Sequence, residues 1–372
     1  MWMTADYVAV AAAWILLVTA IAATVFFLIN NMKKLRRENS IKHEADSELQ
    51  RLSLSFRTAT DNKVSFDGSR HSFDDPSTEA SRNLLRTYSF EQLQKATQRF
   101  SSSNLISGAV HRGRLDGGDV AIRRLPRGVV SRIANQGAID HPNLIRVYGT
   151  CATAADDDGS SSFVVLEYAS NGSVRDWIHG GLAMKNQFIA SCDRFLDWNR
   201  RLKICLDVAN AMRFLHDAVN LFHIGLSVGN VFLDGEFSAK IGCLGIFLSL
   251  ENRGEGGWLV AAPEYERERI VSPSGDVFEF GVVVLEVMSG RTPAIGGGGG
   301  RISDEIERVL GSEEELRGWM DCKMGERYSI DAAVEVAKLA RRCVEEDAAA
   351  RPGAGEIAAR LLNLVEELAA EG

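Results

Sequence analysis

Residues 221–234 read LFHIGLSVGNVFLD, and this stretch decides how the rest of the chain is interpreted. It lies between a run with helical spacing and an apolar run that predicts a buried strand. A loop in this setting is a place where an enzyme holds its general base. No acidic residue precedes Asp234 within the stretch. The pattern therefore indicates a catalytic loop without an acid that accepts a proton.

Strands are predicted before this loop and helices after it. Gly118–Leu125 and Phe163–Ala169 are rich in β-branched residues and bounded by turn residues, which predicts buried strands. Ser89 is the expected N-cap of a short helix that precedes them. After Asp197, apolar residues with helical spacing predict two buried stripes: Leu202, Cys205, Ala209, Met212 and Leu215, then Val336, Leu339, Ala340 and Cys343.

This order of elements predicts a two-lobed α+β domain over residues 88–370. The small β-rich lobe is expected at 88–166 and the large helical lobe at 167–370. The formal net charge of −8 does not favour a nucleic-acid partner. The six cysteines include no CxxC pair and no zinc-type cluster with histidine, so we expect a reducing compartment and no structural metal.

A membrane anchor is predicted near the N-terminus. Residues 7–29 contain 23 residues without a charge, enough to cross a bilayer with some tilt. The alternative is a cleaved signal peptide, because Ala20–Ala22 resembles a cleavage site. A signal peptide has its positive charge before the apolar run, whereas Lys33 and Arg36 follow it. We therefore expect a single-pass anchor with residues 1–6 outside and the domain in the cytoplasm.

Residues 30–87 are rich in Ser, Asn, Asp and Arg, with isolated apolar residues. Such a stretch buries too little apolar surface to offset the entropy of ordering, so a disordered juxtamembrane tail is expected. The glycine run at 296–300 predicts a flexible loop. It does not predict a phosphate-binding loop, because no strand precedes it.

Six strings in a fixed order resemble the protein kinase family, in particular plant receptor-like kinases. The strings read FEQLQKATQRF, HPNLIRVYGTC, LEYASNGSVRDWI, NVFLD, APEY and DVFEFGVVVLEVMSGRTP, and the resemblance covers about residues 88–365. The chain is most similar to the kinase-dead branch of LysM receptor-like kinases. The resemblance implies the two-lobed protein kinase fold and an ATP site between the lobes.

The resemblance also shows which catalytic positions have changed. Kinases need a strand lysine, a helix glutamate, a loop aspartate and a metal-binding aspartate. At these positions the chain has, in the same order, Arg123, Arg132, Gly225 and Cys243. Ser227 stands at the position of the lysine that kinases carry in the same loop. A thiol is a poor ligand for magnesium. No catalytic residue is therefore expected to be competent, and no metal site is expected.

Other family positions are retained. Glu264 and Arg351 match a buried ion pair of the large lobe, and Asp276 matches an aspartate that holds the catalytic loop. Removing one partner of a buried pair typically costs about 3–5 kcal/mol, so these residues suit a scaffold of any activity. The resemblance implies at most weak ATP binding, by four residues: Arg123, Glu167, Tyr168 and Asn230. No cofactor is required.

The preferred interpretation is a receptor-like pseudokinase in the plasma membrane that acts as a signalling adaptor or co-receptor. Its expected partners are other membrane receptor kinases and cytoplasmic signalling proteins. The family's LysM modules bind chitin-like glycans, and none is seen before the anchor, so no direct glycan binding is expected. Two alternatives stay open: a weak Ser/Thr kinase that uses Arg123 and another acid such as Asp234 or Glu236, and a non-functional receptor fragment.

Overall fold

The computed structural model describes residues 85–152, 161–180, 195–222, 225–242, 260–292, 302–325 and 327–371, all within one compact unit. The predicted anchor at 7–29, most of the predicted tail, the glycine run at 296–300 and Cys243 lie outside these ranges. In the described ranges, no helix has the length and apolar character needed to span a bilayer.

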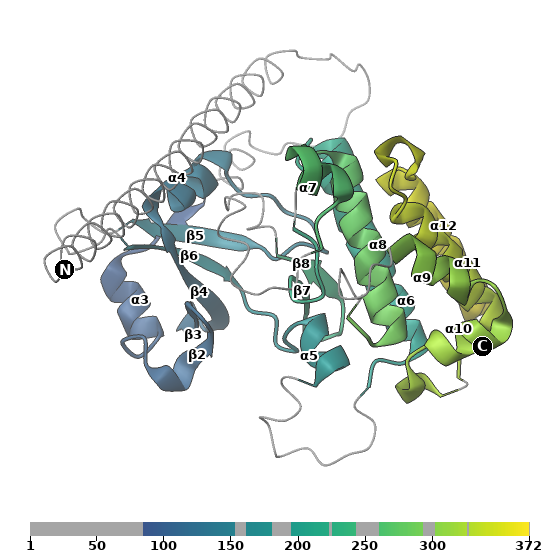
Figure 1. The fold of residues 1–372 in the computed structure, drawn as a ribbon. Helices are drawn as coiled ribbons and strands as arrows, with labels where there is room; N and C mark the ends of the chain where they lie inside the picture. Colours follow the sequence, from purple (N-terminus) through teal and green to yellow (C-terminus); the bar gives the residue numbers. More distant parts are fainter. Residues whose placement is uncertain are drawn as a thin grey trace, which may run out of the picture. The chain divides into compact units, whose positions relative to one another are not determined.

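The first lobe is a twisted sheet with one helix on each face (Figure 1). Its strand order is β1-β5-β6-β4-β3-β2, and every neighbouring pair is antiparallel except β1 and β5. The elements are β1 (Arg86–Thr87), α3 (Phe90–Ala96), β2 (Leu105–Ser107), β3 (Val110–Leu115), β4 (Gly118–Pro126), α4 (Arg127–Gln136), β5 (Val147–Ala152) and β6 (Ser161–Glu167).

The predicted helix start is confirmed. Ser89 caps α3 and forms a capping box with Gln92. The sheet begins at Arg86, two residues before the expected start of the domain, because β1 adds to the edge of β5. Gly149 makes this possible: a Cβ there would lie 2.0 Å from the carbonyl oxygen of Arg86. Any other residue at position 149 would therefore displace β1.

Residues of β4 alternate between the two faces of the sheet. Val120 and Ile122 pack with Leu93 of α3 on one face. Leu125 packs with Val129 and other residues of α4 on the opposite face. This alternation places Arg123 on the α4 face, between the positions of Ala121 and Leu125.

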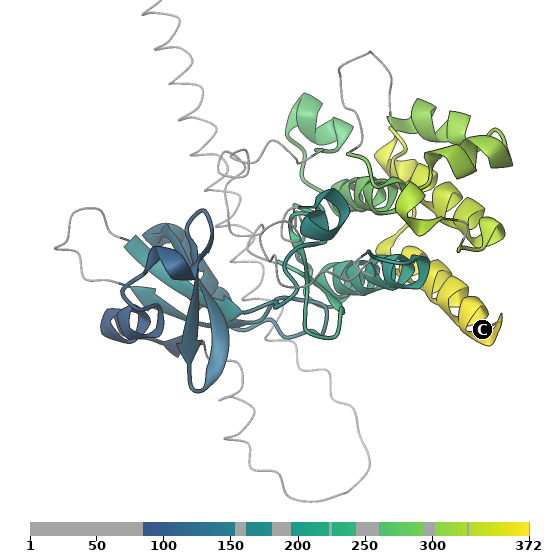
Figure 2. The ribbon, with the colours of Figure 1, turned by 90° about the horizontal axis from the view of Figure 1, so that it is seen from below.

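The second lobe is mainly helical, and both views show it beside the sheet (Figures 1 and 2). It contains α5 (Val174–His179), α6 (Trp198–Arg213) followed by a π turn (Phe214–Ala218), β7 (Val231–Leu233), β8 (Ala239–Ile241), α7 (Pro263–Glu268), α8 (Pro273–Ser289), α9 (Ile302–Val309), α10 (Glu313–Trp319), α11 (Ile330–Cys343) and α12 (Ala354–Glu371). Both predicted apolar stripes are buried in its core. Burial raises the pKa of the Cys205 and Cys343 thiols to about 12, so both stay protonated.

The two lobes are joined by backbone pairing as well as by the chain itself. Leu144 forms a parallel bridge with Ile241 of β8, and the Ile145 N–H donates to the Ile241 carbonyl at 2.9 Å. The Nδ2 of Asn143 donates to the carbonyl of Ala239 at 3.0 Å. The segment that leads into β5 is therefore fixed to the second lobe before it enters the sheet of the first.

Candidate functional site

The predicted catalytic loop is a closed turn, described from Gly225 to Asn230. The side-chain Nδ2 of Asn230 donates to the Gly225 carbonyl at 3.2 Å, and the backbone N–H of Asn230 donates to the Ser227 carbonyl at 2.9 Å. Gly225 has φ +71°, a left-handed conformation that glycine adopts at low cost. The loop is thus well formed although position 225 offers no carboxylate and Ser227 replaces the family's lysine.

Two acidic residues of α8 lie beneath this loop. Asp276 is buried and hydrogen-bonds Nε2 of His216 at 2.8 Å. Glu279 is also buried, and its Oε2 accepts the N–H of Leu226 at 2.8 Å. Glu279 was not predicted as a site residue, although the acidic residues Glu279 and Glu286 inside the apolar run 277–288 were a signal for it. Glu279 thus ties the loop to α8, and Asp276 ties α8 to the π turn that precedes the loop.

Arg123 lies at the position of the family's catalytic lysine, and no acidic residue in the described part of the chain pairs with it. It is partly buried on the α4 face of the sheet, and burial lowers the pKa of its guanidinium. The whole of α4 contains no Asp or Glu, and Arg132 lies on its exposed side. Within the described ranges no carboxylate pairs with Arg123. Among the described residues, the ion pair that positions the nucleotide phosphates in an active kinase therefore does not form.

The two residues expected at the adenine site contribute to other contacts. Glu167 lies at the end of β6, where its Oε1 is 3.0 Å from Nζ of Lys240 on β8. Its Oε2 accepts the backbone N–H of Arg146 at 3.1 Å. The ring of Tyr168 lies under the guanidinium of Arg112, 5.0 Å from the ring centroid. The carboxylate of Glu167 therefore ties the lobes together and is not free for a ligand.

The two acids of the alternative kinase mechanism, Asp234 and Glu236, lie in the turn between β7 and β8. Oδ1 of Asp234 accepts the backbone N–H groups of Glu236 and Ser238 at 3.0 and 2.9 Å. Glu236 is exposed. Because the Asp234 carboxylate is used to close the β7–β8 turn, it is a poor candidate for the missing base.

The donor set does not fit the magnesium ion that the fold family uses. Asn230 offers one amide oxygen, and the next expected ligand is the thiol of Cys243. Magnesium prefers carboxylate and water oxygens in an octahedral arrangement. The described ranges contain no group of three His, Cys, Asp or Glu side chains that could hold a metal ion.

The ion pair predicted for the large lobe is present in the structure. Arg351 donates from Nη1 and Nη2 to the two carboxylate oxygens of Glu264, at 2.7 and 2.8 Å. It also donates to the carbonyls of Ser274 and Glu345, both at 2.8 Å. Burial is the largest influence on the pKa of Glu264 and would raise it. The hydrogen bonds and charge of Arg351, a backbone hydrogen bond and the charge of Arg267 together outweigh burial, and the pKa falls below its ordinary value. The pair joins α7 to the segment before α12.

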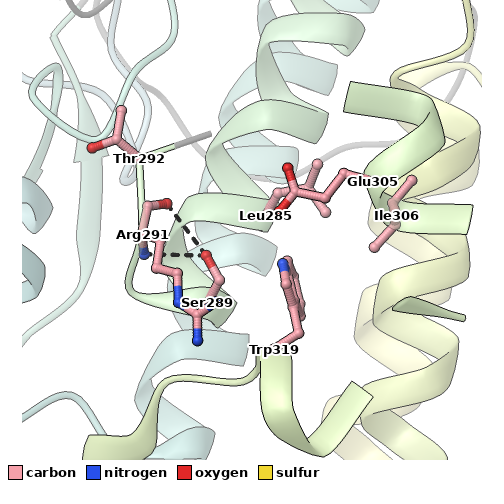
Figure 3. A pocket seen from close by; sticks show the side chains of 7 residues that line it. All are labelled: Leu285, Ser289, Arg291, Thr292, Glu305, Ile306 and Trp319. Atoms are coloured by element: carbon pink, nitrogen blue, oxygen red, sulfur yellow. Dashed lines mark hydrogen bonds between the residues drawn. The ribbon is translucent and has the colours of Figure 1, made fainter. Parts of the chain in front are cut away.

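Two cavities in the second lobe do not involve the predicted site. One lies among α8, α9 and α10 and is lined by residues that include Ser289 and Trp319 (Figure 3). Its volume is about 20 Å³, room for a single water molecule. A larger open hollow of about 350 Å³ adjoins it beside Arg308. Neither contains a residue of the candidate nucleotide site.

A six-stranded sheet, a helical lobe and a catalytic loop at their junction define a protein kinase domain. A family model described as protein tyrosine and serine/threonine kinase matches residues 127–361. The chain belongs to this family and, within it, to the plant receptor-like kinases.

Three similar proteins from Arabidopsis thaliana support this placement. Protein LYK2 is 40% identical over 347 residues, which are 87% of this chain and 52% of LYK2. Protein LYK5 is 33% identical over 76% of this chain and 43% of its own length. LysM domain receptor-like kinase 3 is 28% identical over 75% of this chain and 46% of its own length. The chain thus spans about half the length of these relatives.

A solved structure of a pseudokinase in its apo form has the same fold. It superposes with a TM-score of 0.60 and covers 81% of this chain and 99% of the pseudokinase chain. The two sequences are 19% identical, so the comparison shows the fold alone.

Proposed function

We propose that this chain is a membrane-anchored receptor-like pseudokinase that acts as a signalling adaptor or co-receptor. Arg123 carries the proposal: it lies on the α4 face of the sheet, where no carboxylate of the described residues pairs with it. Gly225 removes the proton acceptor, and Cys243 replaces the metal-binding acid. Each change weakens a separate part of phosphoryl transfer, so their combination removes the mechanism.

The groups that hold the loop and the large lobe are intact. Glu279 supports Leu226, and Arg351 pairs with Glu264. A fold that keeps these costly buried groups while losing its catalytic groups is suited to binding other proteins. By analogy with its relatives, we propose that the chain works at the plasma membrane, anchored by residues 7–29, and that its partners are receptor kinases and cytoplasmic signalling proteins.

A phosphotransfer assay tests the proposal directly. The full-length chain would be purified in detergent and incubated with radiolabelled ATP and magnesium or manganese. We expect no incorporation. Incorporation that Arg123→Ala abolishes would show an atypical kinase, whereas incorporation that survives this change would reveal a contaminating kinase.

Complementation separates an adaptor from a non-functional fragment. Plants that lack the gene would receive either the wild-type chain or the Arg123→Ala variant. An adaptor predicts equal rescue by both, because neither transfers phosphate. Failure of the wild-type chain to restore any altered response would favour the fragment, and rescue by the wild-type chain alone would favour a kinase.

A further inference from the structure

The two lobes carry charge of opposite sign. In the first lobe, residues 85–152 and 161–167 contain ten basic and five acidic side chains. In the described ranges of the second lobe, from residue 168 to residue 371, 28 acidic side chains outnumber 18 basic ones. Such a contrast favours contact between the first lobe of one copy of the chain and the second lobe of another.

The α3 face of the first lobe has an exposed apolar surface. Phe90 is 38% exposed and stacks on Phe100, with the ring centroids 6.0 Å apart. Leu105 of β2 is 46% exposed and lies opposite His111 of β3, whose ring makes a T-shaped contact with Phe100 at 5.4 Å. The exposed side chains of Phe90 and Leu105 are therefore joined through one cluster of rings.

Two exposed arginines lie beside this cluster. Arg124 is opposite Phe163 of β6, and the ring of Phe163 is 5.7 Å from that of Phe90. Arg99 lies in a left-handed turn with φ +59°, a costly conformation for an L-residue, and its N–H donates to the carbonyl of Gln94. Within the described ranges neither guanidinium forms an ion pair. The first-lobe patch is defined as Phe90, Leu105, Arg99 and Arg124.

The last turns of α12 carry the opposite charge. Residues 361–371 contain three acidic residues and no basic one. Leu362 is 44% exposed, and Glu366 lies one turn further along the same face. Glu367 is exposed as well, and neither glutamate has an ion-pair partner among the residues that the structure describes. The α12 patch is defined as Leu362, Glu366 and Glu367.

The stability of α12 does not explain these acids. Negative side chains near the C-terminal end of a helix oppose its dipole and weaken it slightly. Both views place α3 and α12 at opposite ends of the two-lobed unit, so the two patches of one molecule do not meet (Figures 1 and 2). A second copy of the chain, however, offers each patch a surface of opposite charge with an apolar side chain in it.

We propose that copies of this chain associate head to tail, with the first-lobe patch of one copy on the α12 patch of the next. The apolar side chains of the two patches cover one another, and the two arginines pair with the two glutamates. Because the contact uses a different surface on each copy, it can extend to a third copy.

Charge exchange tests this contact. The full-length chain would be purified in detergent, and its self-association measured by sedimentation equilibrium at low and high salt. The wild type should associate, and less so at high salt. Arg99→Glu with Arg124→Glu should lower the association constant about tenfold, as should Glu366→Arg with Glu367→Arg. A chain with all four changes should recover the wild-type association, because the opposite charges meet again.

Arg114→Glu with Arg127→Glu is the matched control. These arginines are exposed in the same lobe outside the patch, so the same change of charge should leave association unaltered. A melting curve checks that each variant folds. Should the glutamate variant fail to melt cooperatively, Arg99→Gln with Arg124→Gln replaces it, and this change should also weaken association.

Three outcomes would overturn the inference. The first is a wild-type chain that stays monomeric at low salt, and the second is a fourfold variant that does not recover association. The third is an effect of the first-lobe changes without any effect of the α12 changes, which would indicate a different occupant of the first-lobe patch. Since the experiment involves neither phosphotransfer nor another protein, its failure would leave the adaptor proposal standing.

Discussion

The carboxylate of Glu279 accepts the backbone N–H of Leu226 at 2.8 Å, and both residues are buried. Leu226 follows directly on Gly225, the position where an active kinase has its catalytic aspartate. The loop thus depends on an acid from α8 for its shape although it has no acid of its own for chemistry. The hydrogen bond that supports the catalytic loop is therefore kept although position 225 offers no carboxylate.

Removing this support should destabilise the domain. Glu279→Ala leaves a buried N–H without an acceptor, which costs about 1–3 kcal/mol of unfolding free energy. Glu279→Gln keeps an acceptor and should cost less. Urea unfolding followed by fluorescence measures both, with Glu268→Ala at an exposed position as the control that changes nothing. Equal losses for Gln and Ala would show that the hydrogen bond is unimportant.

Glu264 should contribute to acid stability. Because the folded pKa of its carboxyl lies below the ordinary value of 4.5, its contribution is present at higher pH and is lost as pH falls through the folded pKa. Glu264→Ala should cost about 3–5 kcal/mol at neutral pH. Glu264→Gln should flatten the acid side of the stability curve. The exposed pair of Lys338 and Glu335 is the control, and Glu335→Ala should cost less than about 1 kcal/mol. Matching acid profiles for wild type and Glu264→Gln would contradict this.

Much of this could be predicted from the sequence, because it depends on local patterns. The Ser89 cap, the strand Gly118–Leu125 and both apolar stripes follow from spacing and residue type, and the structure confirms each one. The two-residue strand β1 could not be predicted. It has no pattern of its own and exists only because Gly149, more than sixty residues away, leaves room for it.

The sequence predicts which catalytic residues of the site are missing, but not how the remaining residues are arranged. The missing acids are read directly from aligned motifs. The role of Glu279 depends on which face of α8 meets the loop, and the position of Asn230 depends on its hydrogen bonds with Gly225 and Gly242. Such relationships depend on packing between distant segments, which the spacing of residues in one segment does not reveal.

Restoring the catalytic aspartate should carry a small conformational cost. Gly225 has φ +71°, where a residue with a Cβ is strained. Gly225→Ala should lower the unfolding free energy by about 1 kcal/mol. Gly225→Asp should lower it somewhat less, since aspartate visits this region more readily. Differential scanning calorimetry compares the two. A stabilising Gly225→Asp would contradict the left-handed backbone at this position.

Arg123 is expected to lower the free energy of unfolding of the domain. Burial lowers the pKa of its guanidinium, and no carboxylate in the described ranges compensates for that burial. Arg123→Met should therefore leave the unfolding free energy unchanged or raise it by about 1 kcal/mol. Arg124→Met, at the adjacent exposed position, is the matched control and should have no effect. A clear loss of stability in Arg123→Met alone would show that the guanidinium has a structural partner.

The pairing of β1 with β5 determines how a force on the N-terminal end of the domain would be transmitted. Arg86 and Thr87 lie against Gly149 and Thr150 of β5, and the segment that leads into β5 is tied through Leu144 and Ile145 to Ile241 in the other lobe. A force applied to the chain before Arg86 would thus be transmitted through backbone hydrogen bonds to β5 and from there to β8. No side chain is part of this path. A bulkier residue at position 149 would prevent β1 from pairing with β5 and so interrupt the path at its first step.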